Sequence, residues 1–193
     1  MLRRLLQLYI GLVLYGVSTA LFVHANLGAD PWDVFHLGVA KQLGISFGTV
    51  IILTGAAVLL LWIPIRQMPG LGTVSNVIVL GLAADATLAV LPPLESMVAR
   101  SALLVGAIVL NAIATGMYIG AGFGPGPRDG LMTGLHARTG WSLRGIRTAI
   151  ELSVLLIGWL LGGKFGVGTV IYALSIGPLI QLCLPWFSQP VSR

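Results

Sequence analysis

Long apolar runs recur along the chain, and the polar residues gather in the short stretches between them. Six of these runs extend over roughly twenty residues, which is the length that a helix needs to cross the hydrocarbon core of a bilayer. The pattern therefore predicts six membrane helices, at about 5–25, 47–65, 71–91, 101–121, 143–161 and 167–187.

Two shorter segments, 31–43 and 127–139, lie between long helices and are too short to cross a bilayer. Each begins with a proline, which suits the first position of a helix because its missing N–H is not needed there. Each ends before a glycine, Gly44 or Gly140, which is typical of a helix C-terminus. We expect a short helix in both places. The pattern leaves open whether these helices dip into the membrane or lie flat on its surface.

The second half of the chain repeats the first at a constant offset of 96 residues. Pairing 1–91 with 97–187 without a gap gives 22 identities, where chance gives about 7 or 8 for a chain so rich in Leu, Gly, Ala and Val. The corner Leu27-Gly-Ala-Asp-Pro-Trp-Asp33 returns as Phe123-Gly-Pro-Gly-Pro-Arg-Asp129. We therefore predict a single membrane domain over 1–193, built from two repeats.

The odd number of long helices in each repeat has a consequence for topology. Because each repeat crosses the membrane three times, the second enters from the opposite side, which gives two inverted-topology three-helix repeats. With the N-terminus inside, the basic residues divide eight to three between the two sides. The eight are Arg3, Arg4, Arg66, Arg128, Arg138, Arg144, Arg147 and Arg193, and the three are Lys41, Arg100 and Lys164. The positive-inside rule then places both termini in the cytoplasm.

The composition narrows the class of protein. Hydrophobic residues make up 56% of the chain and charged residues 9%, and the mean hydropathy is +0.96. A soluble domain carries about 25% charged residues, so we predict an all-α protein embedded in the lipid bilayer. The net charge of +5 does not indicate nucleic-acid binding. The basic residues are scattered at the ends of apolar runs, where membrane topology places them.

Three blocks carry a resemblance to a known family: Leu27-Gly-Ala-Asp-Pro-Trp-Asp-Val34, Pro69-Gly-Leu-Gly-Thr-Val74 and Gly124-Pro-Gly-Pro-Arg-Asp-Gly-Leu-Met-Thr-Gly134. They resemble the YczE/YitT group of small bacterial integral membrane proteins. The resemblance covers nearly the whole chain, and the third block is its most specific part. It implies a polytopic protein of the bacterial inner membrane, with transport or export as the usual suggestion. It supplies no catalytic or ligand residues.

The candidate substrate-binding residues gather at the two repeated corners and on one apolar helix. They are Gly28, Pro31, Asp33, Gly124, Pro127, Arg128, Asp129 and Asn111. Two interpretations of Asp33 and Asp129 stay open. Each carboxylate lies in the first turn of a short helix, where it can cap free N–H groups. Alternatively, the two helix starts line a polar cavity in which the carboxylates contact a substrate.

Three further charged residues allow a structural and a functional interpretation. Arg128 has no counterpart in the first repeat, because Trp32 holds that position. Its charge either helps to fix the topology or meets an anionic group. Glu151 lies inside the fifth long helix one turn after Arg147, so an i,i+4 ion pair is available. Such a pair is either structural or a site at which proton or cation movement is coupled to transport.

Glycines four residues apart form two stripes on predicted long helices. The stripes are Gly116, Gly120 and Gly124, and Gly158, Gly162 and Gly166. Small residues let helices approach closely, so these stripes either seal the two repeats together or form the face of a homodimer. Trp62, Trp159 and Trp186 fall near helix ends, which predicts interfacial anchors.

These features favour a small-molecule transporter, a secondary carrier or exporter whose unknown substrate binds between the two repeats. A substrate-capture subunit of a separately powered importer and a non-transporting membrane accessory protein remain as alternatives. The chain shows no P-loop and no Ser/His/Asp set or paired catalytic carboxylates, so an enzyme is not predicted. No cofactor is expected, since the histidines and Cys183 show no metal-ligand spacing.

Overall fold

The computed structural model describes residues 1–188, and this part of the chain is all-α, with eight helices and no strand. The helices are α1 (Leu2–Ala25), α2 (Pro31–Leu43), α3 (Phe47–Ile65), α4 (Leu71–Val90), α5 (Met97–Gly120), α6 (Pro127–Thr139), α7 (Leu143–Leu160) and α8 (Val167–Phe187). The short helices α2 and α6 begin and end at the predicted residues. Arg193, which entered the charge count, lies outside the described residues.

Five of the helices, α1, α3, α4, α5 and α8, have the length and apolar composition of membrane spans. The helix α7 occupies the place of the remaining predicted span. It carries Arg144, Arg147 and Glu151 within its 18 residues, which is more charge than the other long helices hold. The prediction of an all-α membrane protein is confirmed, and the crossing by α7 stays a prediction.

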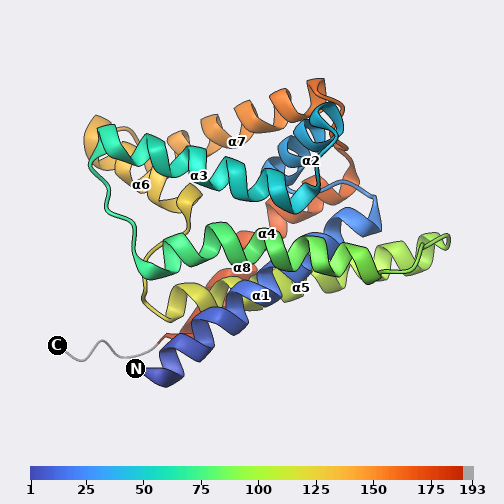
Figure 1. Ribbon diagram of the computed structural model, residues 1–193, viewed down its shortest axis with the longest axis horizontal. Coiled ribbons are helices and arrows are strands. Elements are labelled where there is room, and N and C mark those ends of the chain that lie inside the picture. The colour runs from blue at the N-terminus through green and yellow to red at the C-terminus, as the bar shows by residue number, and fades with distance from the viewer. Residues whose placement is uncertain (189–193) are drawn as a thin grey trace.

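The helices form two layers (Figure 1). In one layer α1 and α5 pack side by side, with α4 against α1 and α8 against α5, while α2, α3, α6 and α7 make the other. Gly11 of α1 lies against Met117 of α5, and Gly16 lies against the Leu80 carbonyl of α4. Apolar burial gains little over contact with lipid, so small residues that allow close packing hold such helices together. The two glycines therefore place α1 at the centre of its layer.

Each short helix packs against a long helix of the other repeat. Helix α2 lies along α7, where Gly158 makes room for Phe35, and α6 lies along α3, where Gly130 makes room for the ring of Trp62. A Cβ at either glycine would overlap the residue opposite it. The two repeats are therefore interlocked through their short helices.

Trp62 is buried in this interlocked packing. Its side chain is 1% exposed, and its Nε1–H donates to the carbonyl of Pro127 at 3.1 Å. The prediction of an interfacial anchor is wrong for Trp62, because its neighbour Gly130 comes from the other repeat and leaves no trace in the local sequence. Trp159 and Trp186 are exposed, as an anchor requires.

Hydrogen bonds between the repeats come in pairs that follow the 96-residue offset. The N–H of Gly168 donates to the Leu27 carbonyl at 2.8 Å, and the N–H of Gly72 donates to the Phe123 carbonyl at 2.9 Å. Each bond joins the start of one repeat's last helix to the other repeat's corner. The sequence duplication is therefore matched by a duplication of contacts.

Two arginines at equivalent positions hold the ends of the central helices. The Nε–H of Arg4 donates to the Ala121 carbonyl at 3.0 Å, and that of Arg100 donates to the Ala25 carbonyl at 2.7 Å. The last carbonyls of a helix have no partner within it, and a guanidinium also suits the negative end of the helix dipole. Each repeat thus stabilises the helix end at the other repeat's corner.

The glycine stripes pack within the chain. Gly116 and Gly120 lie against Phe187 of α8, and Gly166 lies against Leu27 in the first repeat. The contact of Gly166 agrees with the predicted sealing of the two repeats, whereas those of Gly116 and Gly120 lie within the second repeat. Gly124, Gly162 and Gly166 lie outside α5 and α7, so the prediction that each stripe continues along one helix face is wrong. The homodimer stays a prediction.

One interface distinguishes the two repeats. Helix α3 packs along α4, with Gly48 against Gly81. Its N-terminus is held by Asp85, whose Oδ1 accepts the Gly48 N–H at 2.6 Å and whose Oδ2 accepts the Ser46 hydroxyl at 2.5 Å. The equivalent helices α7 and α8 make almost no close approach. Gly177, the counterpart of Gly81, has no atom within 4 Å of a Cβ built on it.

Candidate functional site

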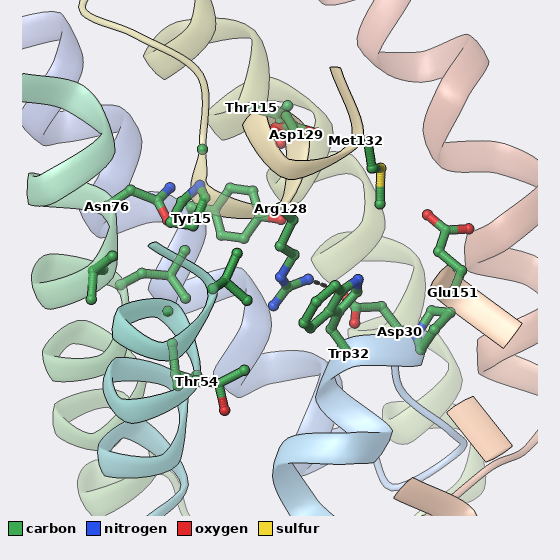
Figure 2. Close-up of a pocket in the computed structure, with 18 of the residues that line it drawn as sticks. Tyr15, Asp30, Trp32, Thr54, Asn76, Thr115, Arg128, Asp129, Met132 and Glu151 are labelled. Carbon is green, nitrogen blue, oxygen red and sulfur yellow. Dashed lines mark hydrogen bonds and ion pairs between the residues drawn. The ribbon is translucent and has the colours of Figure 1, made fainter. Parts of the chain in front are cut away.

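A cavity of ≈ 230 Å³ lies between the two layers and is lined by both repeats (Figure 2). Its polar and aromatic lining comprises Tyr15, Asp30, Trp32, His36, Thr54, Asn76, Thr115, Tyr118, Arg128, Asp129, Arg147, Glu151 and Tyr172. The first repeat contributes the N-cap and first turn of α2, and the second contributes the first turn of α6. Ionisable residues among membrane helices are costly and mark functional sites by default, so this cavity is the candidate site.

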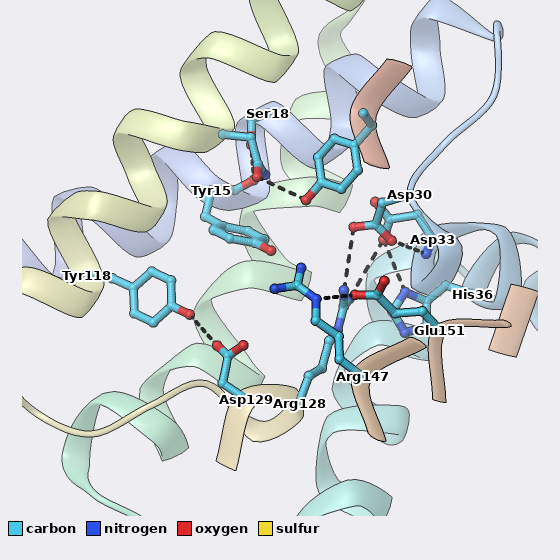
Figure 3. Close-up of polar contacts among 12 residues, drawn as sticks. Tyr15, Ser18, Asp30, Asp33, His36, Tyr118, Arg128, Asp129, Arg147 and Glu151 are labelled. Atoms are coloured by element: carbon cyan, nitrogen blue, oxygen red, sulfur yellow. Dashed lines mark hydrogen bonds and ion pairs between the residues drawn. The ribbon is translucent and has the colours of Figure 1, made fainter. Parts of the chain in front are cut away.

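Arg128 lies at the centre of the charged groups (Figure 3). Its Nη1 is 3.5 Å from Asp30 Oδ2, and its Nη2 is 3.9 Å from Asp33 Oδ1. Its guanidinium also stacks over the ring of Trp32, 4.9 Å from the centroid, where a cation is attracted by the negative face of the ring. Arg128 and Trp32 are equivalent residues of the two repeats. The predicted anionic partner of Arg128 is therefore present within the protein.

The corner of the first repeat holds two buried acids outside the long helices. Burial raises the pKa of Asp33 to about 7, although the charge of Arg128 acts to lower it. Burial and the neighbouring Asp33 raise the pKa of Asp30, against the effect of Arg128. Burial lowers the pKa of His36 to about 3, and Arg128 acts in the same direction. His36 is therefore neutral, and its 3.2 Å contact from Nδ1 to Asp33 Oδ1 is a hydrogen bond rather than an ion pair.

The two acids that the repeats have in common, Asp33 and Asp129, lie in the first turns of the short helices as predicted, but neither is the N-cap residue. The N-cap of α2 is Asp30, whose Oδ1 accepts the N–H of Asp33 at 2.7 Å. The N-cap of α6 is Gly126, without a side-chain cap. The Asp129 carboxylate accepts the hydroxyl of Tyr118 at 3.0 Å. Both carboxylates are therefore engaged by side chains at the cavity.

The predicted ion pair on α7 is present. The Nε–H of Arg147 donates to Glu151 Oε1 at 2.8 Å, and both residues line the cavity. Their counterparts in the first repeat are Ile51 and Gly55, which line the same cavity from α3. One wall of the cavity is thus charged, and the equivalent wall is apolar. A role of the pair in coupling stays a prediction.

The structure brings most of the predicted site residues to the cavity. Those that line it are Pro31, Pro127, Arg128, Asp129, Arg147 and Glu151. Asp33 is not part of the cavity lining, but its Oδ1 lies 3.9 Å from Nη2 of Arg128, which is part of it.

Three predicted residues lie away from this cavity. Gly28 packs against Gly166, and Gly124 packs against Gly70. Both corner glycines therefore position the short helices rather than line the cavity. Asn111 is buried between helices, where it donates to Ser18 Oγ at 2.9 Å and accepts the Tyr172 hydroxyl at 3.3 Å.

Sequence reasoning did not select Asp30, Trp32, Thr115 or the tyrosines Tyr15 and Tyr118 as site residues. A signal was present for two of them, because Asp30 and Trp32 interrupt the repeat at its best-matched corner. The others lie in apolar helices at ordinary spacing, and only the tertiary packing brings them to the cavity.

Within residues 1–188, no group of three or more His, Cys, Asp or Glu residues could hold a metal ion.

Comparisons with known proteins agree with the assignment as a membrane protein. Residues 2–185 match the model of DUF6198, a family of unknown function. The chain is 38% identical to an uncharacterized protein of Haemophilus influenzae, over 92% of this chain and 81% of that protein. It is 30% identical to the uncharacterized membrane protein YczE of Bacillus subtilis, over 92% and 83%. It is 23% identical to the uncharacterized protein YyaS of Bacillus subtilis, over 91% and 90%.

No solved structure matches the chain. The resemblance to YczE is confirmed by these matches, and the resemblance to YitT stays a prediction. The chain is a membrane protein whose apolar helices contact the lipid bilayer.

Proposed function

We propose that this chain, which belongs to the DUF6198 family, is a small-molecule transporter of the bacterial inner membrane, acting as a secondary carrier or exporter. Its substrate binds in the cavity between the two repeats. The observation that carries the proposal is that ionisable side chains from both repeats meet in one cavity among membrane helices. Transporters built from repeats place their substrate site at the interface of the repeats, near the starts of short or broken helices.

The proposed architecture has six membrane helices in two inverted three-helix repeats. In Figure 1 the long helices α1, α3, α4, α5, α7 and α8 alternate in direction along the chain. In this architecture α7 crosses with Arg147 and Glu151 at the cavity and with Leu152 and Leu156 exposed on its surface. Arg147 and Glu151 neutralise each other there, which lowers the cost of charge at that depth. The basic residues favour cytoplasmic termini.

The difference between the two repeats supports alternating access. The α3–α4 interface is closed by the contacts of Asp85, whereas α7 and α8 are apart. Residues on both sides of this gap, Glu151 on α7 and Ile176 and Ile180 on α8, line the cavity, so the gap opens into it. If α7 closed on α8 while α3 parted from α4, the cavity would open toward the other end. Inverted repeats make such an exchange possible because each can adopt the conformation of the other.

Flux through proteoliposomes tests the proposal. Purified wild type is reconstituted and tested with a broad panel of small molecules, beside Asp129→Asn. Asp129 lines the cavity from the second repeat. Loss of its charge is expected to reduce the free energy of substrate binding by about 1.5–3 kcal/mol. This corresponds to a roughly 10- to 100-fold slower flux at low substrate concentration, with membrane insertion unchanged.

Glu95→Gln is the matched control, since Glu95 is an exposed acid in the loop after α4. Normal flux in a well-folded Asp129→Asn protein would overturn the assignment of the site. Flux that appears only with a co-purifying ATPase would favour a substrate-capture subunit. Absence of flux for every compound would favour an accessory protein.

A further inference from the structure

Two buried polar atoms at the cavity have no hydrogen-bond partner in the described part of the chain. They are Nε1 of Trp32 and Oγ1 of Thr115, in side chains that belong to residues only 6% and 5% exposed. Both residues line the cavity and are labelled in Figure 2. Buried polar groups are nearly always hydrogen-bonded. The indole N–H can only donate, so the missing partner of Trp32 is an acceptor atom.

The acids at the cavity are not all held in salt bridges. The carboxylates are Asp30, Asp33, Asp129 and Glu151, and the guanidinium groups are Arg128 and Arg147. Arg128 faces Asp30 and Asp33, whose pKa values are raised by burial, and Arg147 faces Glu151, so Asp129 is the acid of this group that has no salt bridge within residues 1–188. Both guanidinium groups already face carboxylates. Asp129 has a phenol as its partner, the hydroxyl of Tyr118 at 3.0 Å.

The carboxylate of Asp129 lies beside an aromatic pair. Tyr118, which donates to it, packs edge-to-face on Tyr15 with 5.9 Å between ring centroids, and both rings line the cavity. Aromatic faces attract ammonium and guanidinium groups, most strongly when desolvated. The stacking of Arg128 on Trp32 shows that a ring of this cavity already receives a cation.

We propose that the cavity binds a small organic cation, an amine or quaternary ammonium compound that also carries an oxygen acceptor. The cationic end lies between Asp129 and the tyrosine rings. The oxygen accepts the N–H of Trp32. This inference deepens the proposed function and rests on it in placing the substrate in the same cavity. The volume of ≈ 230 Å³ lies below that of the roughly 300–1,000 Å³ pockets that hold drug-sized ligands, so the compound is small.

An anionic substrate fits these observations less well. It would have to compete with Asp30 and Asp33 for Arg128, and with Glu151 for Arg147, whose pair closes at 2.8 Å. It would also leave Asp129 without a cationic partner. A cation satisfies Asp129 without breaking either pair.

Calorimetric titration of the purified full chain in detergent tests the inference independently of transport. The probes are choline, its neutral isostere 3,3-dimethyl-1-butanol, tetramethylammonium, which lacks the hydroxyl, and propionate as an anion. Saturable binding of choline and tetramethylammonium is expected, with choline the tighter. The neutral alcohol and propionate are expected not to bind.

Two variants assign the contacts. Asp129→Asn is expected to weaken the binding of choline and of tetramethylammonium by about tenfold or more, as for the loss of a hydrogen bond to a charged group. Trp32→Phe keeps the ring and removes the N–H. It is expected to lower the affinity for choline by about two- to tenfold and to leave the affinity for tetramethylammonium unchanged. Glu95→Gln is the control that should bind both as the wild type does.

The outcomes separate this inference from the proposed function. Equal binding of choline and the neutral alcohol, preference for propionate, or unchanged cation binding in folded Asp129→Asn would overturn the inference. Flux of an anion in proteoliposomes would also overturn it while supporting transport. Cation binding with no flux of any cation would support the site and overturn transport.

Discussion

Arg128 and Trp32 occupy equivalent positions of the two repeats and contact each other, with the guanidinium 4.9 Å from the ring centroid. A residue can meet its own counterpart only close to the axis that relates two repeats. Identical residues there would place like charge against like charge or ring against ring. The duplication instead holds a cation against an aromatic face, which is an attractive pair. The centre of the candidate site is therefore a place where the repeats differ and where that difference makes an attractive contact.

The corner glycine Gly28 illustrates how the repeat positions this centre. Its φ is +111°, which is accessible to glycine but strained for other residues. A Cβ there would also lie 2.7 Å from the backbone nitrogen of Gly166. We expect Gly28→Ala to destabilise the protein by about 2–5 kcal/mol, from backbone strain and overpacking. The measurement is thermal unfolding in detergent.

Gly44→Ala is the control for this prediction. Gly44 also has a positive φ, of +66°, but nothing lies within 4 Å of its Cβ position. Only the left-handed conformation opposes the alanine, at a cost of about 1–2 kcal/mol. Equal losses in the two variants would show that the contact between Gly28 and Gly166 adds nothing.

At the scale of single residues the sequence predicted the contacts that depend on local spacing. The pair of Arg147 and Glu151 follows from an i,i+4 separation and is present at 2.8 Å. Asp33 lies in the first turn of α2 as predicted, but the N-cap is Asp30, three residues earlier. The tyrosines of the cavity were missed because their spacing in apolar helices does not distinguish them from packing residues.

Among the helices, the feature with the greatest consequence is the one interface that the repeats do not share. Helix α4 holds α3 through Asp85, whereas the equivalent residue on α8 is Gln181. A carboxylate at a helix N-terminus is favoured by the helix dipole and the free N–H groups, and a neutral amide gains less. The closed interface is therefore the better stabilised of the two, and α7 is not held against α8 as α3 is held against α4.

Alanine substitutions at the equivalent glycines Gly81 and Gly177 test this asymmetry. A Cβ at Gly81 would lie 2.5 Å from the carbonyl of Gly48, whereas one at Gly177 would meet nothing within 4 Å. We expect Gly81→Ala to destabilise by about 1–3 kcal/mol. Gly177→Ala is expected to be neutral or to stabilise by up to about 1 kcal/mol, because alanine is the better helix former. Unfolding in detergent measures both.

Similar losses in the two variants would contradict the open α7–α8 interface. Each variant is the control of the other, since both place the same methyl group on the same face of equivalent helices. An effect of Gly177→Ala on flux alone, with stability unchanged, would indicate that α7 approaches α8 during transport.

At the scale of helices the sequence was most informative. Prolines at the starts and glycines at the ends predicted α2 and α6 to the residue. The repeat supported the long helices, because a weak pattern seen twice is stronger evidence than one seen once. The exchange of short helices between repeats was not predictable. It depends on small residues such as Gly130 and Gly158 meeting large side chains that are far away in the sequence.

For the whole molecule, the open gap between α7 and α8 and the distribution of basic residues together indicate from which side of the membrane the cavity is accessible. The N-terminus of α7 and the C-terminal half of α8 lie at the same end of the molecule as the chain's N-terminus (Figure 1). If that end is cytoplasmic, as the basic residues favour, the cavity of this structure opens inward. The closed α3–α4 interface lies at the other end.

Cysteine labelling at one equivalent pair of positions tests this orientation. Ile180 lines the cavity on α8, and its counterpart Ala84 on α4 is 0% exposed. In a Cys183→Ser background, we expect Ile180→Cys to react in inside-out vesicles with a charged methanethiosulfonate that does not cross membranes. Ala84→Cys, which lies toward the opposite face, is expected to be protected from the same reagent in right-side-out vesicles. The same reagent should label Ile180→Cys far more slowly in right-side-out vesicles, because the gap faces away from it.

The pair is informative because the two positions are equivalent in the 96-residue repeat but differ in their burial in this structure. In the proposed inverted architecture the two positions lie at the same depth from opposite membrane faces, so a static and symmetric bundle would label Ile180→Cys from the inside as fast as Ala84→Cys from the outside. Labelling of Ile180→Cys only from the outside would reverse the orientation. Equal labelling of the two positions, each from its own membrane face, would contradict the asymmetry on which the proposed alternating access depends. Protection of Ile180→Cys by choline, without protection of an exposed cysteine at Glu95, would connect the orientation of the gap to occupancy of the cavity.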